Sequence, residues 1–134
     1  MGVTFGRDDW GLPAWTAALA REHDGPALSA RGHARLMKAV RKLSDEDLNA
    51  LVARLLGTAE DPLLQWAHDP VLALELMSTT GAWPERLPGQ VYWVPARREC
   101  LAVFFPRGDG DLIQEFAPSF ARAAVLAWVA WRLS

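Results

Sequence analysis

The chain has 134 residues, of which 51% are hydrophobic and 22% are charged, and its formal net charge is −2. This length is that of one ordinary domain with a core, and the composition excludes a disordered chain. The small negative charge argues against general attraction to nucleic acid or to an anionic membrane. We therefore expect a single domain over 1–134, with a helical part over 1–60 and an α-β-β-β-α unit over 61–134.

The N-terminus and the cysteine content indicate a cytoplasmic protein. Cys100 is the single cysteine, so no disulfide can form within the chain. The first ten residues lack the basic and then apolar pattern of a signal peptide. The longest apolar run, between Arg122 and Arg132, has nine residues and is too short to span a bilayer. We expect no contact with a membrane.

The first half of the chain has the patterns of several helices. A short helix is predicted from Pro13 to about His23. The segment Ser29–Leu43 is amphipathic, with apolar residues at i, i+4 and i+7 on one face and basic residues on the other. Ser44 is the predicted N-cap of the next helix, which Gly57 should end.

Two Asp-Pro pairs predict two further helical pieces. Asp61-Pro62 and Asp69-Pro70 each place an N-cap residue before a proline at the first helical position. The second piece should run to about Thr80. Beyond Gly81 the helical period gives way to the pattern of strands.

Three short runs rich in aromatic and large apolar residues predict an antiparallel meander. The runs are Gln90–Val94, Glu99–Phe105 and Asp111–Phe116. The connections 95–98 and 107–110 are short enough for hairpins. The middle run is apolar on both faces, which predicts that it is the central strand.

A long apolar helix from Pro118 to about Leu133 completes the predicted fold. It carries apolar residues on two sides, so it should be buried on both or offer one face to a partner, for which a symmetric homodimer is the simplest case. The fold class is therefore α+β: a helical N-terminal half, a three-stranded antiparallel meander and a long C-terminal helix. The economical packing is a helix–sheet–helix sandwich.

The sequence contains no pattern that predicts catalysis, a cofactor or a metal. His23, His33 and His68 lack the i, i+4 spacing of a helical zinc site, and one cysteine cannot complete a tetrahedral cluster. His33 shares a helix face with Met37, which favours a structural role. Alternation places Cys100 on a core face. We expect no catalytic, cofactor-binding or metal-binding residue and a protein that is not an enzyme.

A basic helix face is the strongest electrostatic feature of the sequence. No acidic residue occurs between Gly25 and Ser44. The face could contact an acidic protein surface, where charge speeds association and sets specificity. It could also contact phosphates with salt-dependent affinity, or simply be solvated. The basic residues are Arg31, Arg35, Lys38, Arg41 and Lys42.

Seven tryptophans against one tyrosine is an unusual aromatic content. We expect Trp93 and Trp131 in the core. Trp10, Trp15 and Trp83 are the candidates for an interface, because tryptophan is enriched where partner proteins bind most strongly.

The pattern from residue 69 to residue 131 resembles a known family. A helix ends at a small-residue connection with glycine and tryptophan, Ser78 to Trp83, and three strands follow. A helix with an alanine-rich opening, Ala117 to Ala124, closes the unit. This looks like the small α-β-β-β-α "ABA sandwich" domain of phage and prophage proteins, and the central strand Leu101-Ala102-Val103-Phe104 is similar too.

The resemblance covers about half of the chain and includes no diagnostic catalytic residue. It implies a phage or mobile-element origin, and small proteins of that origin often bind and disable host machinery. We therefore expect a non-enzymatic binding protein whose partner is a host protein or a protein–nucleic-acid complex. The alternative is a nucleic-acid-binding accessory protein that uses the basic helix 31–42.

Overall fold

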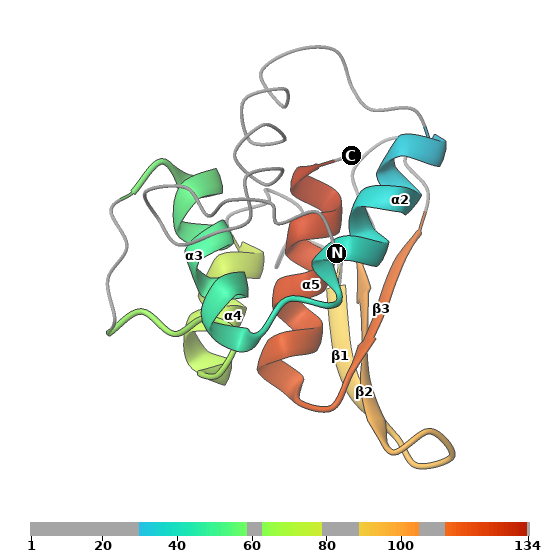
Figure 1. The fold of residues 1–134 in the computed structure, drawn as a ribbon. Coiled ribbons are helices and arrows are strands. Elements are labelled where there is room, and N and C mark those ends of the chain that lie inside the picture. The colour runs from blue at the N-terminus through green and yellow to red at the C-terminus, as the bar shows by residue number, and fades with distance from the viewer. Residues whose placement is uncertain (1–29, 59–62, 79–88, 105–111, 134) are drawn as a thin grey trace, which may run out of the picture.

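The computed structural model describes residues 30–58, 63–78, 89–104 and 112–133 (Figure 1). These residues form four helices and three strands. In chain order they are α2 (Ala30–Val40), α3 (Asp45–Leu56), α4 (Pro70–Ser78), β1 (Gly89–Val94), β2 (Glu99–Phe104), β3 (Ile113–Ala117) and α5 (Phe120–Arg132). The predicted α+β class is confirmed, with N-terminal helices, an antiparallel meander and a C-terminal helix that packs on the sheet.

Local capping residues set the ends of α3 as the sequence predicts. The Asp47 backbone N–H donates to Ser44 Oγ at 3.1 Å, which satisfies a backbone donor of the first turn. Gly57 ends the helix in the left-handed region, with φ 73°, and its N–H donates to the carbonyls of Ala53 and Arg54.

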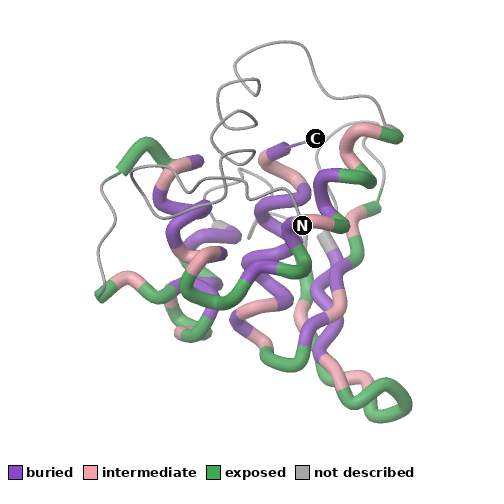
Figure 2. The backbone as a smooth tube through the Cα atoms, in the orientation of Figure 1, coloured by how far each residue is buried: buried purple, intermediate pink, exposed green. Residues whose placement is uncertain are grey.

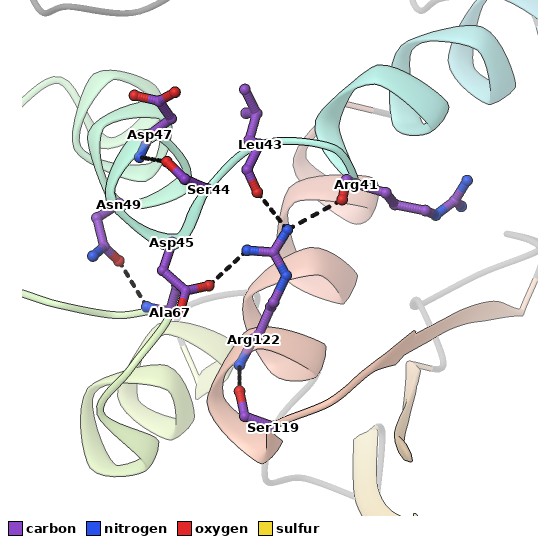
Figure 3. Close-up of polar contacts among 9 residues, drawn as sticks. All are labelled: Arg41, Leu43, Ser44, Asp45, Asp47, Asn49, Ala67, Ser119 and Arg122. Atoms are coloured by element: carbon purple, nitrogen blue, oxygen red, sulfur yellow. Dashed lines mark hydrogen bonds and ion pairs between the residues drawn. The ribbon is translucent and has the colours of Figure 1, made fainter. Parts of the chain in front are cut away.

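The start of α4 also follows its predicted cap, but the piece before it differs from expectation. Asp69 Oδ1 accepts from the backbone N–H groups of Val71 and Leu72, and Pro70 is the first helical residue. Residues 63–69 form turns and no helix, whereas Asp61-Pro62 lies outside the described residues. The Ala67 N–H donates to Asn49 Oδ1 at 2.7 Å, so a side chain of α3 holds this segment in place of a helical bond (Figure 3).

The sheet has the order β1-β2-β3, so β2 is the central strand as predicted. Its register pairs Cys100 with Trp93 of β1 and with Ala117 of β3. Directly paired residues share a face, and Cys100 and Ala102 belong to the core together with residues of α5. Leu101 and Val103 point to the opposite face and are also buried. The central strand is therefore apolar on both faces, as its sequence requires.

Helix α5 is the centre of the described structure. It contacts all three strands on one side and α4 on another, with α3 and α2 also packed against it (Figure 1). Every residue from Ala123 to Ala130 is buried, and Figure 2 shows this burial along almost the whole helix. Since α5 is apolar on all sides, it can form a middle layer between the sheet and α4. The sheet thus covers one apolar side of α5, and the preceding helices cover the other.

Helix α2 runs antiparallel to α5. His33, near its start, contacts the Ala130 carbonyl through Nε2 at 2.7 Å, close to the end of α5. Arg41, just beyond its end, lies beside Arg122 near the start of α5. His33 is half-buried, which agrees with its predicted structural role. The apolar face of α2 (Leu36, Met37 and Val40) is buried in the same core.

Candidate partner-binding surface

The outer face of α2 carries a row of cations. Each member is exposed, and among the described residues none of them forms a salt bridge. We call this row the basic stripe: it consists of Arg31, Arg35 and Lys38 of α2 together with Lys42 in the turn that follows the helix. The burial of Met37 and Val40 on the inner face fixes which side of α2 the stripe occupies. The stripe is thus presented by a helix whose other side is held in the core.

Arg41 has a different place from the other predicted basic residues. Its Nε and Nη2 atoms donate to the two carboxylate oxygens of Glu115, at 2.7 and 2.8 Å. Glu115 is in β3, and its side chain is 4% exposed, whereas that of Arg41 is 47% exposed. Such a bidentate pair combines charge with fixed geometry. Arg41 therefore links the end of α2 to the sheet.

The charge state of Arg41 follows from this geometry. The hydrogen bond to Glu115, reinforced by the charge of that carboxylate, raises the pKa of the Arg41 guanidinium, while burial acts in the opposite direction. A raised pKa means that the stabilisation which depends on the charge of Arg41 is fully present below the ordinary pKa of arginine. This stabilisation falls as the pH rises through the still higher folded-state pKa. At neutral pH the link between α2 and the sheet is intact.

A second arginine fixes the turn between α2 and α3. Arg122 of α5 donates to Asp45 Oδ1 at 2.6 Å, to the Leu43 carbonyl at 2.6 Å and to the Arg41 carbonyl at 3.1 Å (Figure 3). The two carbonyls belong to the end of α2 and the turn after it, where helical partners are missing. Because a guanidinium has several donors in a rigid fork, one side chain can satisfy all three acceptors. The position of α2 on the body of the protein is therefore set at both Arg41 and Arg122.

An acidic cluster lies at the end of the basic stripe. The first turn of α3 contains Asp45, Glu46 and Asp47, which begin three residues after Lys42. Asp45 is paired with Arg122, and Glu46 is exposed. Carboxylates are favourable at a helix N-terminus because they complement its dipole. The charge of the surface thus changes from positive at Lys42 to negative at Glu46, four residues later.

The tryptophans are distributed differently from the prediction. Trp10, Trp15 and Trp83 lie outside the described residues. Trp131 is half-buried against the core. Trp93 was expected in the core, and this is wrong: it is 53% exposed, and its neighbour Tyr92 is 47% exposed. Both lie in β1, an edge strand whose outer side has no strand neighbour in the described sheet.

The remaining candidates for chemistry are Cys100 and two of the histidines. Cys100 is buried on the core face, as its alternation predicts. His68 is exposed, and His23 lies outside the described residues. Within the described ranges, no three side chains of His, Cys, Asp or Glu are grouped so that they could hold a metal ion. None of the described helices is long and apolar enough to cross a bilayer.

Two residues that fix the position of α2, Glu115 and Arg122, were not predicted from the sequence. Glu115 lies among the apolar residues Ile113 and Ala117 on one face of its strand, and this position indicates a buried charge that needs a partner. Arg122 and Arg132 are the two charged residues of an apolar helix, and the same argument applies to Arg122. Neither pattern says which of the 14 basic or 16 acidic residues is the partner.

Comparison with protein-family models, with curated proteins and with solved structures found no match for this chain.

Proposed function

We propose that this chain is a small non-enzymatic binding protein of phage or prophage type, which binds a host protein or protein complex through the basic stripe of α2. The observation that carries the proposal is the row of four exposed cations, which have no salt-bridge partner within the described residues. Exposed cations that a fold does not use are available to an acidic partner.

The packing of α2 supports binding by a preformed surface. Arg41 and Arg122 hold the end of the helix, and the His33 contact holds its start. A surface that is already ordered loses little conformational entropy when a partner binds. Arg41 itself is committed to Glu115, so the binding role rests on the other four basic residues.

The experiment is capture of a partner from a bacterial lysate by the wild-type chain and by Arg35→Glu. We expect wild type to recover one partner in a stoichiometric amount and Arg35→Glu to lose it. Arg98→Glu is the matched control, because Arg98 is exposed in the β1–β2 hairpin and the substitution changes the net charge from −2 to about −4 in the same way. Equal recovery by all three chains would contradict the proposal.

Nucleic acid is the alternative partner for the same face. The absence of acidic residues between Gly25 and Ser44 in the sequence favours it. In that case the affinity for a generic duplex or single strand should fall steeply as salt rises. No binding at low salt would remove this alternative.

A further inference from the structure

The basic stripe is a straight row along one side of α2. Arg31, Arg35 and Lys38 lie four and three residues apart, so they fall within an arc of about 60° on a helix of 3.6 residues per turn. Lys42 follows in the turn after the helix and continues the row. From Arg31 to Lys38 the row is about 10 Å long at 1.5 Å per residue, and Lys42 extends it beyond the end of the helix. Its cations are therefore spaced as residues on one face of an α-helix are spaced.

The end of the row restricts which polyanion can lie along it. A nucleic-acid backbone that followed the stripe beyond Lys42 would meet the acidic turn of α3, where Glu46 is exposed. Phosphates repeat along the whole backbone, and like charges placed opposite one another are unfavourable. A protein segment can carry its acidic residues over a limited length and then end or change sign. The change of sign thus favours a protein partner over nucleic acid.

From these two observations we infer that the bound segment of the partner is an α-helix with carboxylates at positions i, i+4, i+7 and i+11, laid along α2. This inference rests on the proposed function, because it specifies the partner of the same face. A helix with that spacing repeats the axial intervals of the stripe and can face each cation with one carboxylate. Exposed ion pairs are individually weak, so binding to the row should be modest and should fall with salt.

The test uses fluorescence anisotropy with the full chain and three labelled probes at low salt. The first is a helical peptide with four glutamates at the stated spacing, and the second has the same composition with its glutamates spread around the helix. The third is a duplex DNA of about 20 base pairs, which exceeds the stripe in length at 3.4 Å per pair. We expect the aligned peptide to bind at least about tenfold more tightly than the scattered one and more tightly than the duplex. Arg35→Glu should weaken the aligned peptide by about tenfold, and Arg98→Glu should leave it unchanged.

Two results would overturn the inference. Equal affinity for the two peptides would show that spacing is not recognised, and tighter binding of the duplex would make nucleic acid the partner. The lysate experiment separates this failure from failure of the proposed function. If Arg35→Glu loses a captured partner while the two peptides bind equally, the helical spacing is wrong and the binding face stands. If Arg35→Glu changes neither the capture of a partner from the lysate nor the affinity for the aligned peptide, both proposals fail.

Discussion

At the scale of single residues, two arginines connect segments that are far apart in the chain. Arg41 and Glu115 are 74 positions apart, and Arg122 reaches back 77 positions to Asp45. The two sites differ in exposure. The Glu115 carboxylate is almost fully buried, whereas Asp45 remains about half exposed. Burial makes an unpaired charge costly, so the partner of Glu115 matters more than the partner of Asp45.

Replacing Arg41 should therefore destabilise the protein through the carboxylate that is left behind. We expect Arg41→Ala to lower the free energy of unfolding by about 2–3 kcal/mol, less than for a fully buried pair because water reaches Arg41. The double variant Arg41→Ala/Glu115→Leu should regain most of this loss, since it leaves no buried charge. Chemical denaturation measures both. A double variant as unstable as the single one would show that the pair does not act through its charges.

Arg122 should depend on its shape as well as on its charge. Arg122→Lys keeps the attraction to Asp45 but cannot reach Arg41 and Leu43 carbonyls with the same rigid fork. We expect a loss of about 1–2 kcal/mol in unfolding free energy. The matched control is Arg132→Lys, because Arg132 makes a long contact of 3.5 Å to the Leu55 carbonyl, and a change within about 0.5 kcal/mol is expected there. Similar losses at both positions would contradict the role given to Arg122.

At the scale of elements, the end of α3 depends on the backbone of Gly57. Its φ of 73° is in the left-handed region, and an added Cβ would meet no atom within 4 Å. The cost of Gly57→Ala is thus conformational, and we expect about 1 kcal/mol of lost stability in thermal or chemical unfolding. Gly57→Asn should cost less, because asparagine tolerates this conformation better than alanine does. If asparagine were as costly as alanine, the left-handed backbone conformation would not be the source of the loss.

Elements that are defined by local chemistry could be predicted from the sequence. The cap at Ser44, the glycine at position 57 and the Asp69-Pro70 start act within a few residues, so the pattern alone locates them. The central strand could be predicted because it is apolar on both faces. The turns over 63–69 could not, because Asn49, a residue of another element, supplies a hydrogen bond there.

The candidate site was less predictable than the fold for a related reason. Exposure of Arg31, Arg35 and Lys38 follows from helical period, since the apolar face of α2 has to be buried. The ion pair between Arg41 and Glu115 does not follow from the helical period, because it depends on which strand lies beside the helix. Trp93 was placed wrongly because a strand pattern does not show how far the neighbouring helices cover each strand: Trp93 pairs with the buried Cys100 and is nevertheless 53% exposed.

At the scale of the whole molecule, α5 connects parts that would otherwise be separate. It lies against the three strands, and it also packs against α4, α3 and α2 (Figure 1). Alanines supply about half of its buried residues, and their small side chains allow the neighbouring elements to approach closely. The sheet and the helical layer therefore share one core, and we expect them to unfold in a single transition.

Overpacking α5 tests this shared core. Ala127 is fully buried, so Ala127→Leu has to displace neighbours and should cost about 1–3 kcal/mol. Far-UV circular dichroism, which reports mainly on the helices, and tryptophan fluorescence, to which Trp93 of β1 and the buried Trp128 of α5 contribute, should show the same lowered midpoint. The same change at the exposed Ala34 of α2 should shift stability by no more than about 0.5 kcal/mol. Two separate midpoints in Ala127→Leu would mean that the sheet and the helical layer unfold independently, because an insertion into a shared core has to weaken both at once.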